Sequence, residues 1–301
     1  MKVLVTGTSG QLGFDVMNEL IRRGHEAVGV DRAQSEADFK HIVLDITNRD
    51  KVMEVVEELR PDAIIHCAAW TNVDAAEEPE NLKVVRAVNV DGTQNLAEAA
   101  AKVNAKMMYI STDYVFDGTG ERPWQPDDKE YAPLNVYGQS KLDGELAVEK
   151  YVEKFFVVRI AWVFGKNGKN FIRTMIEVGK THDTLRVVDD QIGTPTYTFD
   201  LARLLVDMIE TDKYGYYHAT NEGGYISWAD FADEIFKQAG MDVKVERVTT
   251  AEYGASKAKR PFNSRLDKSK LVEAGFKPLP DWKDALKRFL VDLDLHSDVK
   301  Y

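Results

Sequence analysis

Five short, mainly apolar runs are spaced along the first 160 residues of the chain, each bounded by polar or glycine-containing segments. Runs of this length without a regular alternation of polar positions are typical of strands buried on both faces of a parallel sheet. The sequence therefore predicts buried strands at residues 2–5, 26–30, 63–67, 106–111 and 155–160.

The segments between these runs carry apolar residues at helical spacing, as Val16 and Leu20 do after the first strand. Helices are predicted after the first strand up to Gly24, between Asn48 and Pro61, over residues 81–104 and around Tyr137. Regular alternation of strand and helix predicts an α/β fold with a doubly wound (Rossmann) parallel sheet.

Beyond Phe164 the alternation loosens. A short strand is predicted at residues 185–188, a helix returning to the sheet at 199–209 and a capped amphipathic helix at 227–239. This part is expected to pack as a smaller C-terminal α/β substrate-binding lobe, with a cleft between the lobes. The predicted division is 1–164 plus about 196–219 for the Rossmann domain, and about 165–195 plus 220–301 for the second lobe.

A glycine-rich turn follows the first strand, with Gly7, Gly10 and Gly13 at three-residue spacing. Such a turn lets the backbone approach a pyrophosphate, which the following helix N-terminus also attracts. The spacing is not that of the commonest dinucleotide fingerprint, and an ordinary βα loop is the alternative. However, the second strand ends in Asp31, about 20 residues on, where an acid would hold an adenosine ribose 2′-hydroxyl. The two features together predict a dinucleotide site.

Two adjacent residues favour different dinucleotides. Asp31 accepts from a 2′-hydroxyl and repels a 2′-phosphate, which favours NADH, whereas Arg32 can pair with the phosphate of NADPH. Use of both NADPH and NADH is therefore expected.

Tyr137 and Lys141 lie four residues apart in a predicted helix. Because four residues make about one helical turn, the phenol and the ammonium project from the same face. A neighbouring cation is expected to lower the tyrosine pKa from about 10, which would make the phenol a better proton donor. A helix surface that carries both residues by chance is the alternative, and the pair alone does not decide the matter.

The composition favours a soluble enzyme. The net charge is −11 and no dense Lys/Arg run occurs, which argues against a nucleic-acid partner. No apolar stretch nears the roughly 18 residues that span a membrane, and no signal peptide precedes the first strand. The single cysteine, Cys67, cannot form an intrachain disulfide, and the six histidines show no metal-ligand spacing. A cytoplasmic protein without membrane association is expected.

Eight short motifs occur in order along the chain. They are G-x-x-G-Q-L-G at 7–13, L-D-I-T at 44–47, A-A-W-T-x-V-D at 68–74, S-T-D-Y-V-F at 111–116, Y-x-x-x-K at 137–141, R-x-A-W-V at 159–163, D-Q-x-G-x-P-T at 190–196 and R-P-x-N-S at 260–264. Over nearly its whole length the chain closely resembles the dTDP-4-dehydrorhamnose reductases, which are extended short-chain dehydrogenase/reductases. The resemblance implies NAD(P)H-dependent reduction of the C4 keto group of dTDP-4-dehydro-L-rhamnose, the last step of dTDP-L-rhamnose synthesis for cell-surface polysaccharides.

The resemblance also implies roles for single residues. Tyr137 would protonate the oxygen on C4 of the sugar, Thr112 would hydrogen-bond the same oxygen, and Lys141 would hold the nicotinamide ribose. The implied cofactor site comprises Gly7, Gly10, Gln11, Leu12, Gly13, Asp31, Arg32, Asp45, Ile46, Ala68, Ala69, Trp70, Thr71, Tyr137 and Lys141.

The implied substrate contacts are Val73, Thr112, Asp113, Tyr137, Trp162 and Arg260. Three of them have a structural alternative. Asp113 is also placed to form a turn at the strand end, and Trp162 could be an ordinary core tryptophan instead of a platform for the hexose. Arg260 suits the diphosphate, but an exposed arginine that contacts only water is its alternative.

Two departures from related patterns bear on function. Tyr114 stands where sugar-nucleotide 4,6-dehydratases usually carry glutamate, so the acid for water elimination is missing. Ala75 stands where family members commonly carry lysine, so any contact from that lysine is missing.

The regulatory subunit of methionine adenosyltransferase resembles the same family and binds NADP as a non-catalytic module, which makes it the alternative function. Thr112, Tyr137 and Lys141 are all present and favour a reductase.

Some relatives dimerise through a metal held by acidic side chains. Asp15 would belong to such a set, but the sequence identifies no further member, so neither Mg²⁺ nor another metal is expected. A dTDP-sugar is the expected partner, and the chain is expected to be a monomer or a homodimer.

Overall fold

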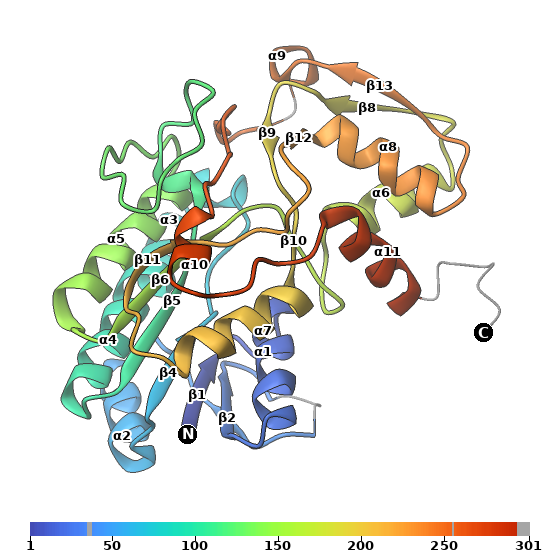
Figure 1. The fold of residues 1–301 in the computed structure, drawn as a ribbon. Coiled ribbons are helices and arrows are strands. Elements are labelled where there is room, and N and C mark those ends of the chain that lie inside the picture. Colours follow the sequence, from blue (N-terminus) through green and yellow to red (C-terminus); the bar gives the residue numbers. More distant parts are fainter. Residues whose placement is uncertain (35–37, 255, 294–301) are drawn as a thin grey trace.

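The structure is a computed structural model that describes residues 1–34, 38–254 and 256–293. A seven-stranded parallel sheet with the order β11-β6-β5-β4-β1-β2-β3 lies at its centre (Figure 1). Its strands are β1 (Lys2–Thr6), β2 (Glu26–Asp31), β3 (His41–Val43), β4 (Ala63–His66), β5 (Lys106–Thr112), β6 (Phe155–Ile160) and β11 (Gly215–His218). The strand order reverses between β1 and β4, so the predicted doubly wound sheet is confirmed.

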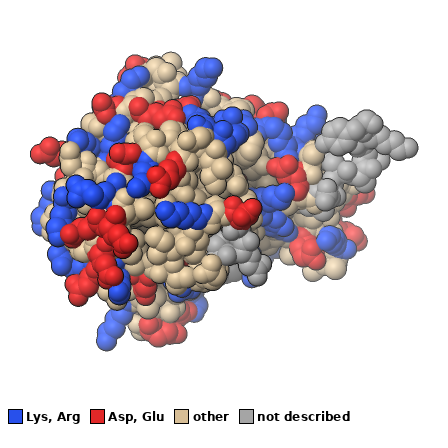
Figure 2. All heavy atoms as spheres, turned by 90° about the horizontal axis from the view of Figure 1, so that it is seen from below, with Lys and Arg blue, Asp and Glu red and all other residues tan. Residues whose placement is uncertain are grey.

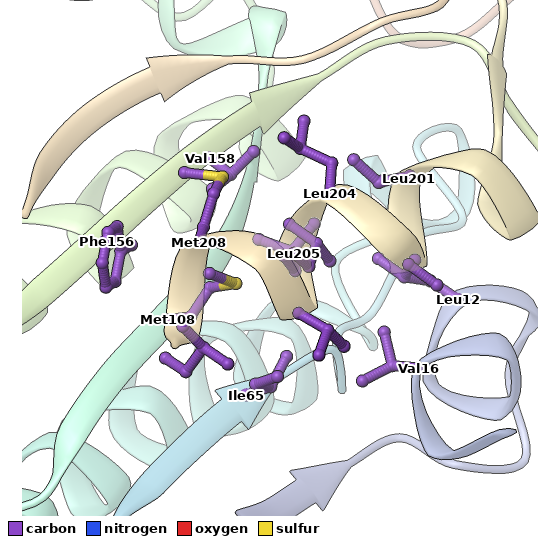
Figure 3. Packing of buried hydrophobic residues seen from close by; sticks show 14 of the residues in the cluster. Leu12, Val16, Ile65, Met108, Phe156, Val158, Leu201, Leu204, Leu205 and Met208 are labelled. Atoms are coloured by element: carbon purple, nitrogen blue, oxygen red, sulfur yellow. The ribbon is translucent and has the colours of Figure 1, made fainter. Parts of the chain in front are cut away.

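Helices cover both faces of this sheet. One face carries α1 (Gln11–Arg22) and α7 (Thr198–Ile209), and the other carries α2 (Arg49–Leu59), α4 (Thr93–Lys102) and α5 (Val136–Tyr151). Figure 3 shows the first layer, where Val16 and Leu205 from the helices meet Ile65 and Met108 from the strands. Because both faces are covered, the central strands need apolar residues at successive positions, which explains their missing alternation.

The predicted helix boundaries agree with the structure. The Asn48 side chain accepts a hydrogen bond from the Lys51 N–H at 3.2 Å, and Arg60, in the left-handed conformation, ends α2 just before Pro61. At the start of α8 (Trp228–Gln238), Ser227 caps the first turn through a reciprocal pair of hydrogen bonds.

The predicted helix over residues 81–104 forms in three parts. They are α3 (Leu82–Arg86), the π-helical turn η2 (Ala87–Gly92) and α4. A π-helical turn is rare, and it often occurs at functional sites.

The elements that follow β6 and belong neither to the central sheet nor to the helices on its faces pack in two clusters, one around Phe231, Trp282 and Phe289 and one around Phe236. They are α6 (Phe171–Gly179), α8, α11 (Trp282–Asp292), and the strand pairs β8 (Thr184–Val188) with β13 (Lys244–Val248), β9 (Ile192–Gly193) with β12 (Ile226–Ser227), and β7 (Val163–Phe164) with β10 (Thr196–Tyr197). Shorter segments are η1 (Ala75–Glu77), η3 (Asp113–Val115), α9 (Thr250–Tyr253) and α10 (Ser269–Glu273). The strand predicted at 185–188 and the helix at 199–209 are thus present, whereas the assignment of residues to two lobes stays a prediction.

Acidic and basic side chains are interspersed on the face shown in Figure 2. That face therefore has no uniformly basic surface of the kind that binds nucleic acid. Within the described ranges, no helix combines the length and the apolar character needed to cross a membrane.

Candidate active site

A cavity of about 820 Å³ opens at the carboxyl ends of β1, β2, β4, β5 and β6, where open α/β sheets bind their ligands. The predicted site residues that line it are Gly7, Gly10, Gln11, Leu12, Gly13, Asp31, Arg32, Asp45, Ile46, Ala68, Ala69, Trp70, Thr71, Val73, Thr112, Asp113, Tyr137, Lys141 and Trp162. Among the described residues, only Arg260 of the predicted set lies outside this lining.

The glycine turn has the geometry of a phosphate cradle. Gly7 has φ +72°, and an added Cβ would lie 2.6 Å from the Ala68 nitrogen. A Cβ on Gly13 would lie 2.3 Å from the Gly7 carbonyl oxygen, so both positions need glycine for close packing. No acidic side chain stands in the described first turn of α1, which begins at Gln11. The turn and the helix N-terminus therefore fit the pyrophosphate of a dinucleotide.

The Asp31 carboxylate is fixed beside this turn. Its Oδ2 accepts from the Ser9 N–H at 3.1 Å, and its Oδ1 accepts from the Arg32 N–H at 2.8 Å. Both Asp31 and Arg32 line the cavity, so their opposite charges face one region of it.

Asn89, in the π-helical turn, ties the cofactor side of the cavity to the Tyr137 helix. Its Oδ1 accepts from the Trp70 N–H at 2.7 Å, and its Nδ2 donates to the Trp70 carbonyl at 3.1 Å and to Ser140 Oγ at 2.9 Å. Sequence reasoning missed Asn89. The available signal was a polar residue on the helical face of Val85 and Leu96.

Lys141 lies on α5 with its ammonium buried under the cavity. Its Nζ donates to the Ile110 carbonyl at 2.7 Å and sits 4.2 Å from the centroid of the Tyr109 ring. Burial lowers the pKa of Lys141 to about 7, and the nearby negative charge of Glu145 opposes part of that shift.

The expected lowering of the Tyr137 pKa by Lys141 is wrong for this structure. Burial raises the pKa of the Tyr137 phenol, the negative charge of Asp113 raises it further, and a hydrogen bond with Thr112 opposes the rise. The physical reason is that desolvation disfavours the phenolate while the ammonium is directed at the Ile110 carbonyl. A raised pKa keeps the phenol protonated, which is the form that a proton donor requires.

Thr112 and Asp113 lie where β5 ends, beside the Tyr137 phenol. The Thr112 hydroxyl donates to Asp113 Oδ1 at 3.1 Å and accepts from the Tyr114 N–H at 3.2 Å. Burial raises the pKa of Asp113 to about 6. Asp113 is the first residue of η3, so it does form a turn at the strand end. It lines the cavity as well, so the turn does not exclude a substrate contact.

Trp162 adopts a backbone conformation that is unusual for a bulky residue, with φ +50°. Its indole stacks on that of Trp228, with the ring centroids 3.8 Å and the planes 17° apart, and an added Cβ on Gly193 would lie 2.9 Å from it. Both indoles line the cavity, so Trp162 is not a purely internal core residue. Sequence reasoning missed Trp228, whose signal was an aromatic side chain at the start of a capped helix.

Arg260 is bound to a carboxylate and not to water alone, so its exposed-arginine alternative is wrong. Its Nη1 donates to Asp74 Oδ1 at 3.1 Å and its Nη2 donates to Asp74 Oδ2 at 2.8 Å. The Arg260 charge is close enough to Tyr114, which lines the cavity, to oppose the rise in the Tyr114 pKa that burial causes. Arg260 therefore lies outside the cavity lining but near Tyr114, which belongs to it.

Asp15, the residue considered for a metal set, accepts from Thr198 Oγ1 at 2.5 Å, and burial raises the pKa of its carboxyl to about 6. In the described ranges, no three His, Cys, Asp or Glu side chains are grouped so that they could hold a metal ion. The expectation that the chain binds no metal stays a prediction.

The parallel sheet, the glycine turn and the Tyr137–Lys141 pair at one cavity define an extended short-chain dehydrogenase/reductase. More closely, the family model described as RmlD substrate binding domain matches residues 1–295, and the chain belongs to this family. The resemblance drawn from the motifs is thereby confirmed.

Several relatives match almost end to end. The chain is 41% identical to a dTDP-4-dehydrorhamnose reductase of Aggregatibacter actinomycetemcomitans, over 95% of this chain and 97% of the relative. The crystal structure of a dTDP-4-dehydrorhamnose reductase from Clostridium acetobutylicum has a TM-score of 0.90 and 41% identity, covering 98% of this chain and 100% of that chain. The crystal structure of a dTDP-4-dehydrorhamnose reductase from Bacillus anthracis in complex with NADP has a TM-score of 0.89 and 41% identity. The match covers 97% of this chain and 100% of that chain.

Proposed function

We propose that this protein reduces the C4 keto group of dTDP-4-dehydro-L-rhamnose to give dTDP-L-rhamnose, with NADPH or NADH as the reductant. One observation carries the proposal: Thr112, Tyr137 and Lys141 line the same cavity as the glycine turn. A proton donor, an anion-stabilising hydroxyl and a dinucleotide cradle thus face one space, as carbonyl reduction requires. The names of the relatives supply the substrate class.

The cofactor side of the cavity is built by the chain's own backbone. Gly10, Gln11 and Leu12 are placed to hold the pyrophosphate, and Asp45 and Ile46 to flank the adenine. Ala69, Trp70 and Thr71 would line the nicotinamide half, and Asn89 would hold that segment through the Trp70 backbone. A nicotinamide cofactor bound in this way supplies the hydride.

Residues at the end of β5 and the start of α5 would hydrogen-bond and protonate the reacting oxygen. Tyr137 would give its phenolic proton to the oxygen on C4, and Thr112 would hydrogen-bond the same oxygen as negative charge develops. Lys141 would bind the nicotinamide ribose through its ammonium. The substrate would also contact Val73, Asp113 and the Trp162 indole, with the diphosphate directed toward Arg260.

The regulatory-subunit function is the weaker candidate. A non-catalytic NADP-binding protein has no need for a phenol, a buried hydroxyl and a buried ammonium around one cavity, and here all three are present. The deciding experiment incubates the purified protein with dTDP-4-dehydro-L-rhamnose and NADPH and follows the loss of nicotinamide absorbance. Binding of NADPH without any turnover would favour the regulatory function over the reductase function. A cytoplasmic monomer or homodimer without a bound metal belongs to the same proposal.

We expect both cofactors to be used, with catalytic efficiencies within about tenfold, or 1.4 kcal/mol, of each other. Asp31→Ala should shift the ratio toward NADPH, because it removes the charge that repels a 2′-phosphate while Arg32 stays. The measurement is kcat/KM for each nucleotide in both proteins. A preference above a hundredfold for either nucleotide in the unmodified protein would contradict mixed use.

The pH dependence follows from Lys141. Because burial lowers its pKa to about 7, the ammonium is present below that pH and is lost above it. Efficiency with respect to the cofactor, which reports the free enzyme, should therefore fall as the pH rises through about 7. Lys141→Arg, which stays charged, should flatten this limb of the profile. A profile of the unmodified protein that is flat from pH 6 to 9 would show that the cation is not needed.

A further inference from the structure

Residues 256–260, called the strap below, cross from the C-terminal part of the chain to the loop after β4. Asp74 in that loop holds the strap through its carboxylate. Its Oδ1 accepts from the backbone N–H of Lys257 at 3.1 Å and of Ala258 at 3.0 Å, and both of its oxygens accept from Arg260. The Asp74 carboxylate therefore makes four hydrogen bonds to this segment, which lies more than 180 residues away in the sequence.

Two further contacts hold the strap in place. The Asn135 Nδ2 donates to the Lys259 carbonyl at 2.8 Å, and the Lys257 ammonium pairs with the Glu78 carboxylate. Asn135 is also the N-cap of α5, so the strap is attached to the start of the helix that carries Tyr137. Loss of one contact from Asp74 should therefore leave the strap positioned.

The Arg260 guanidinium lies between a charge partner and the cavity wall. Both of its Nη atoms donate to Asp74, and the Arg260 side chain is only 23% exposed. Its charge acts on the neighbouring Tyr114 phenol, and the Tyr114 ring lies edge-on to Tyr137 with the centroids 5.7 Å apart. The guanidinium is therefore close to the Tyr137 end of the cavity, and it forms its bidentate pair with Asp74.

We propose that Asp74 sets the affinity of this site for the diphosphate of the sugar nucleotide by competing with it for Arg260. The inference rests on the proposed function, because it takes a nucleoside diphosphate as the ligand. The edge formed by both Nη atoms cannot pair bidentately with a carboxylate and with a phosphate at once, so a diphosphate that binds this edge displaces Asp74. Asp74 also carries a negative charge that repels the diphosphate. The carboxylate keeps Arg260 ordered before binding and favours release of the product.

Asp74→Asn separates the competition from the attachment of the strap. Three of the four hydrogen bonds to Asp74 end on Oδ1, and the fourth ends on Oδ2. An asparagine oxygen in the Oδ1 position keeps the three, whereas its NH₂ group cannot accept from Arg260 Nη2. The variant therefore retains the strap, breaks the bidentate pair and the charge attraction, and leaves Arg260 held by the single hydrogen bond from Nη1.

The test is calorimetric titration of NADPH-loaded protein with dTDP. We expect Asp74→Asn to tighten dTDP binding by about 3–10-fold and Arg260→Ala to weaken it at least tenfold. In the Arg260→Ala background, Asp74→Asn should change the affinity by less than about twofold, because the contested group is absent. Glu78→Gln is the matched control, since it removes an equal charge from a partner of the strap, and it should also stay within about twofold.

The results separate this inference from the proposed function. If the unmodified protein binds dTDP but Asp74→Asn weakens binding or leaves it unchanged, Asp74 does not compete and the inference is overturned while the reductase proposal stands. If Glu78→Gln raised the dTDP affinity equally, or if Asp74→Asn raised it undiminished in the Arg260→Ala background, the effect would be general charge repulsion. Either result would also overturn the inference. If the unmodified protein binds no dTDP, the proposed function and this inference both fail.

Discussion

Tyr137→Phe should lower kcat by about 10²–10⁴-fold. The substitution removes the hydroxyl that would protonate the oxygen on C4 and leaves the ring, which packs edge-on against Tyr114. Because the ring keeps its packing, the melting temperature and the affinity for NADPH should stay close to those of the unmodified protein. Turnover is measured as loss of nicotinamide absorbance, and cofactor affinity by calorimetry.

Tyr114→Phe is the matched control for this substitution. It removes a phenolic hydroxyl from the neighbouring ring, which lines the same cavity but lies in the field of the Arg260 charge. We expect this control to affect mainly the Michaelis constant of the sugar nucleotide, with less than about a tenfold loss in kcat. If Tyr137→Phe kept more than a tenth of the activity, or if the two variants lost kcat equally, Tyr137 would not be the acid.

The fold could be predicted because its signals are local. Each central strand is a short apolar run, and Asn48 and Ser227 mark helix starts through hydrogen bonds to residues only three positions away. The cavity residues could be predicted for a related reason. Most of them directly follow strands, and parallel strands bring their carboxyl ends to one edge of the sheet.

The failures concern interactions between distant parts of the chain. Arg260 meets Asp74 across 186 positions, and no pattern in either segment specifies that contact. The Tyr137 pKa was misjudged because helical spacing places Lys141 on the same face but does not show that both groups are desolvated or that the ammonium turns to the Ile110 carbonyl. Asn89 was missed because its role depends on a π-helical turn, which a regular helical period does not predict.

A fully buried ion pair lies one turn beyond Lys141 on the same helix. Glu145 and Arg159 are both 0% exposed, with Arg159 Nε donating to Oε1 at 2.8 Å and Nη2 donating to Oε2 at 2.7 Å. Arg159 also donates to the Pro126 carbonyl at 3.2 Å and to the Tyr131 hydroxyl at 3.0 Å. The pair therefore joins α5, β6 and the loop that precedes α5 at one point in the core.

Glu145→Ala should lower the free energy of unfolding by about 3–5 kcal/mol, because it leaves the Arg159 guanidinium buried without a counter-charge. Denaturant titration measures the loss. Glu149→Ala, one turn further along α5 in a partly exposed pair with Lys129, is the control and should cost at most about 1 kcal/mol from that pair. The double variant Glu145→Leu/Arg159→Met should recover much of the stability, because no charge then remains in the core. A loss below 1 kcal/mol in Glu145→Ala would mean that water or another group stabilises the Arg159 charge, and the pair would then not be what holds the Tyr137 helix against β6.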